Sequence, residues 1–160
     1  MDNSKERTLK LLEDVIFLKK TALFSSMETG DLRAIAAIAE EVAFKTEEEI
    51  VKENDVGDSM YIIKKGSVVI EKAISEKERV TLAEFSRGDC FGEMALFDAE
   101  LRSASVHAKE PCVLLYIKSD DLNDLLLSYP TIAIEFLKTF VKRLRKANET
   151  IEQLSAEKKE

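Results

Sequence analysis

The chain has 160 residues, of which 45% are hydrophobic and 34% charged, and its formal net charge at pH 7 is −7. This length allows one domain with a core large enough to fold without disulfides or metals. The acidic balance argues against a general nucleic-acid binder, because neutralising phosphates requires a basic surface.

Neither a membrane span nor a secretory signal is expected. No apolar run reaches the roughly 18 residues of a spanning helix, and the first ten residues are charged without a following secretory apolar region. Cys90 and Cys112 have the spacing of neither a zinc site nor a redox motif. Free thiols indicate a reducing compartment, so we expect a cytoplasmic protein.

Two helices are predicted in residues 1–42. Ser4 can cap a helix over about Lys5–Lys20, whose apolar residues form one wide face: Leu9, Leu12, Val15, Ile16 and Phe17. A second helix is predicted over Asp31–Val42, where apolar residues again recur at helical spacing.

Residues 43–118 have a different pattern, with short segments rich in Val, Ile, Tyr and Phe that are interrupted by glycines and Pro111. Turns at this spacing are typical of an antiparallel sandwich or barrel. The predicted fold class is therefore α+β, mainly β, with helices at both ends of the chain.

Two more helices are predicted in residues 119–160. Asp120 and Asp121 suit the first turn of one, and Pro130 suits the first turn of a longer one that ends near Ser155. From Ile134, this long helix has a heptad stripe of Leu137, Val141, Leu144, Asn148 and Ile151. Such a stripe predicts a parallel two-stranded coiled coil, hence a homodimer, although it could instead pack on its own chain.

The segment FGEMALFDAELRSASVHA, Phe91–Ala108, contains the residues that we expect to bind a ligand. Glu93 opens a short helical turn, and Arg102 follows nine residues later. Backbone N–H groups at a helix start favour an anion, and a guanidinium fork can hold a phosphate. A carboxylate only accepts hydrogen bonds, so Glu93 is expected to bind sugar hydroxyls. Phosphate and sugar together suggest a nucleotide.

These residues resemble the phosphate-binding cassette of the cyclic nucleotide-binding domain family. That family includes bacterial catabolite activator protein, the regulatory subunit of protein kinase A and cyclic-nucleotide-gated channels. The matching positions are Phe91, Gly92, Glu93, Met94, Ala95, Leu96, Arg102, Ser103 and Ala104. The resemblance extends upstream through Val51–Lys72 and the Gly88-Asp89 turn. It implies an antiparallel jelly-roll β-barrel with N-terminal helices, a short phosphate-binding helix and C-terminal helices.

The resemblance implies a non-catalytic sensor of a purine 3′,5′-cyclic monophosphate, with cyclic AMP favoured over cyclic GMP and no cofactor. It implies that Glu93 binds the ribose 2′-hydroxyl and Arg102 the phosphate. Backbone groups around Gly92, Met94 and Ala95, with Ser103 and Ala104, complete the predicted site. The base is expected to stack on strand residues, for which Val80 and Leu82 are candidates.

Three positions depart from the family pattern. Ala99 stands where a glycine is usual, Leu101 where a proline is common, and Asn54 where a turn glycine is usual. Asn tolerates the left-handed region, so that change is modest. The other two bear on affinity and support an alternative, a degenerate, ligand-free dimerising scaffold. A cyclic dinucleotide is a further alternative ligand.

Catalysis is not expected. A jelly-roll metal enzyme of the cupin type needs several histidines, and His107 is the single histidine. The sequence contains no Ser-His-Asp set and no Walker loop.

An output domain is not expected either. The roughly 25 residues beyond Ile134 are predicted to form one helix. We therefore expect no winged helix-turn-helix for DNA binding in this sequence. We therefore expect the output to be an unidentified protein effector, or the chain to be a fragment of a larger one. A standalone bacterial-type protein is the interpretation we favour.

Overall fold

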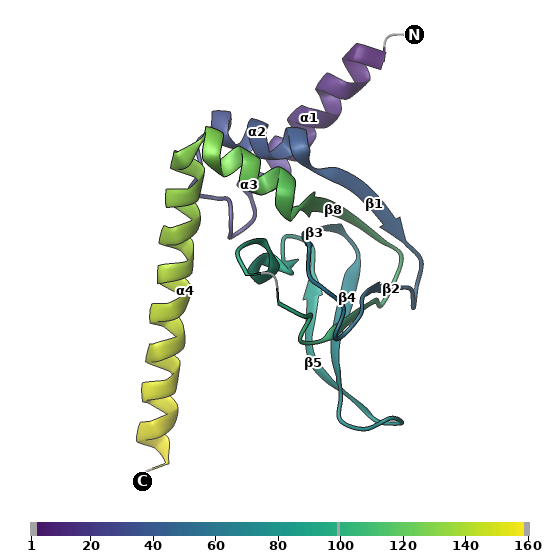
Figure 1. The fold of residues 1–160 in the computed structure, drawn as a ribbon, viewed down its shortest axis with the longest axis vertical. Coiled ribbons are helices and arrows are strands. Elements are labelled where there is room, and N and C mark those ends of the chain that lie inside the picture. The colour runs from purple at the N-terminus through teal and green to yellow at the C-terminus, as the bar shows by residue number, and fades with distance from the viewer. Residues whose placement is uncertain (1–2, 99, 159–160) are drawn as a thin grey trace.

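A computed structural model describes residues 3–98 and 100–158, and contains two antiparallel sheets flanked by helices from both ends of the chain (Figure 1). The elements are α1 (Asn3–Lys19), α2 (Thr29–Ile38), β1 (Glu40–Phe44), β2 (Glu49–Val51), β3 (Ser59–Lys65), β4 (Ser67–Ala73), β5 (Arg79–Ser86), β6 (Cys90–Phe91), the 3₁₀ helix η1 (Glu93–Leu96), β7 (Ser105–Ala108), β8 (Cys112–Lys118), α3 (Ser119–Ser128) and α4 (Pro130–Glu157).

The sheets have the strand orders β1-β8-β3-β6 and β2-β7-β4-β5, and the strands pair antiparallel in both. This order confirms the predicted jelly roll, in which strands close in sequence alternate between two packed sheets. Among the described residues, hydrogen-bonded ladders keep the two sheets separate, so the molecule is a sandwich rather than a closed barrel.

The predicted end of the second helix at Val42 is wrong. Helix α2 ends at Ile38, and Val42 lies inside β1, opposite Leu114 of β8. Pairing with a strand far along the chain satisfies the backbone of residues 40–44, and this tertiary contact outweighs the local helical spacing. The predicted N-terminal helical part, residues 1–42, thus includes the start of the first strand.

Helix α1 buries only part of the apolar face that its spacing predicts. Val15, Phe17 and Leu18 are buried, whereas Leu9, Leu12 and Ile16 are exposed. Lys64 of β3 fixes this helix to the first sheet, with Nζ 2.7 Å from Asp14 Oδ1 and 2.9 Å from Glu41 Oε2. The hydrogen bond from Lys64 lowers the pKa of Glu41.

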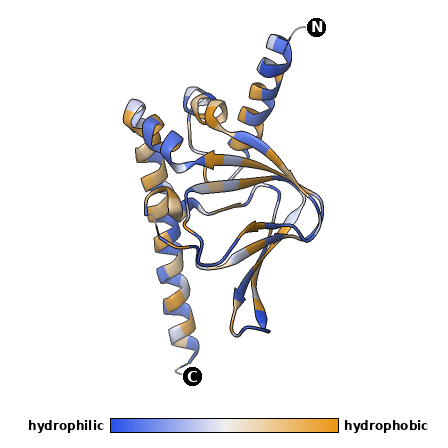
Figure 2. Cartoon of the chain, turned by 45° about the vertical axis from the view of Figure 1, so that its right-hand side comes forward, coloured by the Kyte–Doolittle hydropathy of each residue, from blue (hydrophilic) through white to orange (hydrophobic). Residues whose placement is uncertain are grey.

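The apolar core has two parts, one on each side of the first sheet. Met60 and Ile62 of β3 pack under the helices, whereas Ile63 faces the second sheet. Strand β3 is buried on both faces for this reason, and its sequence is a continuous apolar run rather than an alternation. Figure 2 shows hydrophobic residues, in orange, along the central strands and on the helices.

The two C-terminal helices meet at Tyr129, whose backbone is not helical (φ −130°, ψ 76°). A residue before proline is disfavoured in the helical region, and Tyr129 lies outside it. Helix α4 buries Ile132 and Phe136 near its start, and its second half extends away from the sandwich (Figure 1). The apolar residues of the predicted dimer stripe are exposed in this structure: Leu137, Val141, Leu144 and Ile151.

Candidate functional site

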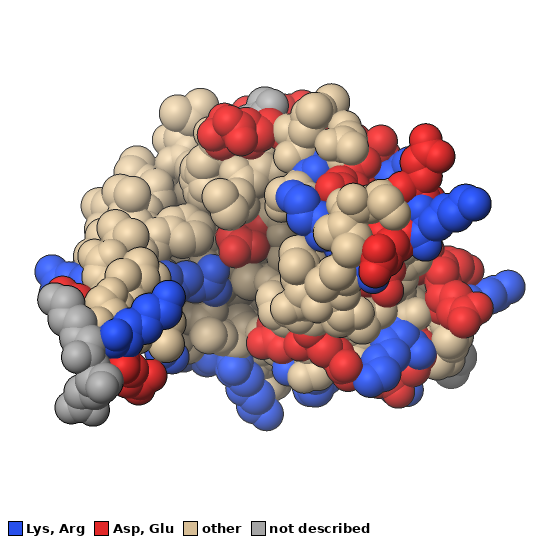
Figure 3. All heavy atoms as spheres, turned by 90° about the horizontal axis from the view of Figure 1, so that it is seen from below, with Lys and Arg blue, Asp and Glu red and all other residues tan. Residues whose placement is uncertain are grey.

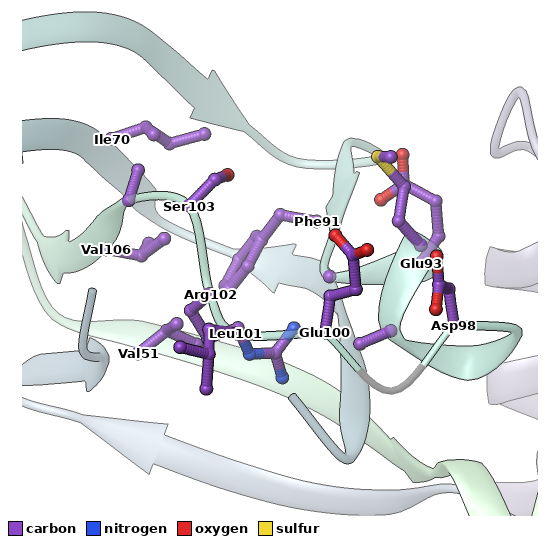
Figure 4. Close-up of a pocket in the computed structure, with 14 residues that line it drawn as sticks. Val51, Ile70, Phe91, Glu93, Asp98, Glu100, Leu101, Arg102, Ser103 and Val106 are labelled. Carbon is purple, nitrogen blue, oxygen red and sulfur yellow. The ribbon is translucent and has the colours of Figure 1, made fainter. Parts of the chain in front are cut away.

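A cavity of about 240 Å³ lies between the second sheet and the segment that follows β6. The inner face of the sandwich supplies an apolar wall of Val51, Ile70, Phe91 and Val106. The opposite wall is polar and comes from residues 92–104 (Figure 4). The cavity therefore offers an apolar surface to one part of a ligand and charged groups to another.

The first part of the polar wall is η1, the short helical turn that the sequence predicts. Gly92 precedes it with φ +80°, in the left-handed region that glycine adopts easily. Leu96 anchors the turn because its side chain is buried in the core beneath the helices. Glu93, Met94 and Ala95 thereby line the cavity, where Met94 is largely exposed, and the Ala95 N–H donates to Gly92 O at 3.2 Å.

Hydrogen bonds to Ser59, Asp55 and Asn54 hold Arg102 in place. Its Nη2 donates to Ser59 O at 2.6 Å and to Ser59 Oγ at 3.3 Å. Its backbone N–H donates to Asp55 O at 2.7 Å, and its carbonyl accepts from the Asn54 N–H at 2.9 Å. A guanidinium has five N–H donors, so donors not used on Ser59 can bind an anion.

Two glycines make room for this arginine. A Cβ at Gly57 would lie 2.7 Å from Ala95 Cβ and 3.2 Å from Arg102 Nε. A Cβ at Gly92 would lie 2.6 Å from Arg102 Nη1 and 2.9 Å from Ser59 O. The guanidinium thus packs against bare backbone on both sides, which explains why glycine matters at these positions.

Three carboxylates share the cavity with Arg102. Glu93, Asp98 and Glu100 all line it, and Figure 4 shows the Glu100 carboxylate above the Arg102 guanidinium. Carboxylates repel a free anion but accept hydrogen bonds from hydroxyl and amino groups. A ligand that combines one anionic group with several neutral donors suits this arrangement better than a simple anion does.

Glu93 also contacts the C-terminal helix. Its Oε1 lies 3.2 Å from Nη1 of Arg143 in α4. Burial, followed by the charge of Glu93, raises the pKa of the neighbouring Cys90 thiol to about 11. Cys90 is therefore protonated at neutral pH and is not a nucleophile.

The structure brings together most of the residues predicted for the site. The cavity lining includes Gly92, Glu93, Met94, Ala95, Arg102, Ser103 and Ala104. Leu101 also lines it, whereas the predicted departure at Ala99 lies outside the described residues. Ser103 lies at the apolar end, where Lys72 Nζ donates to its carbonyl at 3.2 Å.

The structure does not bring the two predicted base contacts into the lining. Val80 and Leu82 lie on β5 and are 42% and 56% exposed. Val80 pairs with Lys72, two residues beyond Ile70, and Leu82 lies at the register shift between the pairs Ile70–Ala83 and Glu71–Thr81. Their contact with a base stays a prediction.

Sequence reasoning did not identify the apolar wall. Ile70 and Val106 are opposite each other on β4 and β7, within alternating segments that indicate a buried face without showing what that face borders.

Two further properties concern the described residues as a whole. In residues 3–98 and 100–158, no group of three or more His, Cys, Asp or Glu side chains has the geometry of a metal site. Over the same residues, no helix has the length and apolar character needed to cross a bilayer.

Comparison with known families gives one match. The model of the family described as "Cyclic nucleotide-binding domain" matches residues 41–129 of this chain. The match begins in β1 and ends just after α3, so it includes both sheets and the whole cavity lining.

Curated relatives come from fungi and bacteria. The chain is 34% identical over 110 residues to the cAMP-dependent protein kinase regulatory subunit of Emericella nidulans, a match covering 69% of this chain and 26% of that protein. It is 27% identical over 140 residues to the cyclic AMP receptor protein of Thermus thermophilus, covering 88% of this chain and 65% of the relative. The chain thus spans about a quarter of the fungal regulatory subunits it matches.

Solved structures agree with this fold. The N-terminal domain of a transcriptional regulator from Streptomyces coelicolor A3(2) superposes with a TM-score of 0.77 at 27% identity, covering 84% of this chain and 94% of that domain. The regulatory domain of Toxoplasma gondii PKA, crystallised with cAMP, gives 0.74 at 25% identity, covering 91% of this chain and 52% of the other.

Proposed function

This chain belongs to the cyclic nucleotide-binding domain family, and from that membership we propose that it is a non-catalytic sensor of a purine 3′,5′-cyclic monophosphate, with cyclic AMP favoured over cyclic GMP. One observation carries the proposal. A preoriented guanidinium, Arg102, and a hydroxyl-accepting carboxylate, Glu93, line the same cavity, opposite an apolar wall. The relatives named for cyclic AMP support the choice of nucleotide.

In the proposed complex, each part of the nucleotide meets a wall of matching chemistry. Arg102 and the backbone N–H groups around Gly92, Met94 and Ala95 hold the phosphate. Glu93 accepts the ribose 2′-hydroxyl. Ser103 and Ala104 complete the cradle, and the base stacks on the aliphatic side of the cavity, with Val80 and Leu82 at its outer end.

We further propose that α4 carries the signal. Figure 3 shows a hollow between this helix and the sandwich. Tyr129, non-helical between α3 and α4, is a suitable hinge. A nucleotide can shift α4 only by its differential affinity for two helix positions, and contacts between α4 and the base would supply that difference.

The exposed stripe of α4 supports a homodimer as the signalling form. Leu137, Val141, Leu144, Asn148 and Ile151 repeat at heptad spacing on the part of α4 that extends from the sandwich. An unidentified protein effector in the cytoplasm would then bind the paired helices according to their position.

A ligand-free dimerising scaffold of the same fold is the second candidate. One observation favours it: three carboxylates and a single guanidinium line the described cavity, a balance that opposes anion binding. The two proposals differ in whether the cavity binds a nucleotide at all.

Calorimetric titration of the purified chain with cyclic AMP and with cyclic GMP tests the proposal. Removing one partner of a buried charge pair costs about 2–5 kcal/mol, so Arg102→Ala should weaken binding by about 30-fold or more. Arg33→Ala, on the exposed side of α2, is the matched control and should bind as wild type does. An unchanged isotherm for Arg102→Ala would remove Arg102 from the phosphate site, and no heat from wild type would favour the scaffold.

A further inference from the structure

Glu100 lies beside the candidate phosphate site on a fixed stretch of backbone. Three backbone hydrogen bonds join residues 100–102 to residues 54–57: Gly57 N–H to Glu100 O at 3.2 Å, Arg102 N–H to Asp55 O at 2.7 Å, and Asn54 N–H to Arg102 O at 2.9 Å. Val56 and Leu101 form an antiparallel bridge between the same two stretches. The backbone that carries Glu100 is therefore held as firmly as the backbone that carries Arg102.

Glu100 and Arg102 also share a side of this stretch. In an extended segment, side chains two residues apart point to the same side, and both of these residues line the cavity. Figure 4 shows the Glu100 carboxylate above the Arg102 guanidinium. An anion that binds the guanidinium therefore lies near a negative group that the backbone keeps in place.

No ion pair compensates the charge of Glu100 in the part of the chain that the structure describes. Glu93 has a partner, because its Oε1 lies 3.2 Å from Nη1 of Arg143, whereas Asp98 and Glu100 take part in none of the ion pairs. Arg102 is the only Lys or Arg among the described residues that line the cavity. Repulsion by Glu100 on a bound anion is therefore offset by Arg102 alone.

The charge of a phosphate group depends on its number of ester bonds. A 3′,5′-cyclic phosphate is a diester with one negative charge, whereas a monoester has a second ionisation with a pKa of about 6 and carries about −1.5 to −2 at pH 7. Coulomb repulsion from a fixed carboxylate is proportional to the ligand charge. Glu100 thus opposes a monoester up to about twice as strongly as it opposes a cyclic diester.

We propose that Glu100 is a specificity-determining residue, which selects singly charged cyclic phosphodiesters against phosphomonoesters such as 5′-AMP. Arg102 supplies the attraction that either phosphate needs, and the carboxylate beside it limits how much negative charge the cavity accepts. The same repulsion lowers the affinity for the cyclic nucleotide, but by less than it lowers the affinity for the monoester. This inference rests on the proposed function, because it names the ligand class that the same cavity rejects.

The test measures how affinity depends on ligand charge when the carboxylate is neutralised. Calorimetry gives the affinity for cyclic AMP, and displacement of bound cyclic AMP gives the affinities for adenosine, which is neutral, and for 5′-AMP. The proteins are wild type, Glu100→Gln, Glu100→Asp and Glu76→Gln. Glu100→Gln removes the charge with little change of shape, and Glu100→Asp keeps the charge. Glu76→Gln removes the same charge from the exposed turn between β4 and β5, outside the cavity lining.

The expected changes follow from Coulomb's law. One unit of charge at about 6 Å, in a water-like dielectric because Glu100 is exposed, changes affinity about threefold. Glu100→Gln should therefore bind cyclic AMP about threefold more tightly than wild type, bind 5′-AMP about five- to tenfold more tightly, and bind adenosine equally well. Glu100→Asp and Glu76→Gln should stay within about twofold of wild type for each ligand.

Each contrary outcome is distinct. Weaker binding of cyclic AMP by Glu100→Gln would mean that Glu100 accepts a hydrogen bond from the ligand, and equal gains for cyclic AMP and 5′-AMP would mean an effect unrelated to ligand charge; either overturns the inference. Unchanged affinities, or no displacement by 5′-AMP from wild type and Glu100→Gln alike, would mean that shape excludes the monoester. These results also overturn the inference and leave the proposed function intact. Failure of wild type to bind cyclic AMP would overturn both.

Discussion

Replacing Gly92 with alanine tests the preorientation of Arg102, and Gly88 offers a matched control. Both glycines have positive φ, +80° at Gly92 and +90° at Gly88. An added Cβ at Gly92 would lie 2.6 Å from Arg102 Nη1 and 2.9 Å from Ser59 O, whereas at Gly88 it would meet nothing within 4 Å. The two substitutions share the backbone penalty and differ in the contacts with Arg102 and with the Ser59 carbonyl.

The magnitudes follow from this difference. An L-residue in the left-handed region costs roughly 1–2 kcal/mol, so both variants should lose about that much free energy of unfolding. At Gly92 the guanidinium must also move, because the end of a side chain shifts more easily than the Ser59 carbonyl. Losing a buried charge contact entirely costs about 2–5 kcal/mol. A displaced one should cost at least about 1.4 kcal/mol, which is tenfold in affinity.

Urea unfolding gives the stability of each variant, and calorimetry with cyclic AMP gives the affinity. Gly92→Ala should bind at least about tenfold more weakly than Gly88→Ala, and the difference should vanish in an Arg102→Ala background. Equal affinities for the two glycine variants would refute the idea that bare backbone at Gly92 positions the guanidinium.

Three other properties can be measured on the unliganded chain. The hydrogen bond from Lys64 lowers the pKa of Glu41 below its ordinary 4.5, so its stabilisation is present above pH 4.5 and is lost as pH falls through the lowered value. Between pH 6 and 3, urea unfolding should show a smaller loss of unfolding free energy for Glu41→Gln than for wild type. Equal losses would contradict the assignment. Because burial raises the pKa of Cys90 to about 11, a thiol reagent should modify Cys90 far more slowly in the native state at pH 8 than in urea, and equal rates would contradict its burial. Deleting the residues after Arg143 removes most of the exposed stripe of α4 and should shift sedimentation from dimer to monomer, whereas an unchanged mass would place any dimer contact elsewhere.

The cassette could be predicted from the sequence because its parts are close together along the chain. Glu93 and Arg102 are nine residues apart, and the glycine, the short turn and the arginine all lie in one segment. Local backbone preference also explains Asn54, which adopts the expected left-handed conformation with φ 70°. Tyr129 before Pro130 likewise interrupts the helices at the expected place.

Features that depend on distant pairing could not be predicted in this way. The helix predicted to end at Val42 gives way to β1 because β8, some 70 residues later, supplies a partner strand. The contact between Glu93 and Arg143 joins residues 50 positions apart, and nearby the Phe97 ring packs edge to face against Phe136 and Phe140 of α4. Alternation marks Ile70 and Val106 as inward-facing, but only the paired sheets determine that they border the cavity.

The most direct test of the account is titration of the wild-type chain with cyclic AMP and, separately, with adenosine, which carries the same base and ribose but no phosphate. The account predicts saturable binding of one cyclic AMP per chain and much weaker binding of adenosine, because in the proposed complex Arg102 and the η1 backbone contact only the phosphate. Equal affinity for the two, or no binding of cyclic AMP, would contradict it.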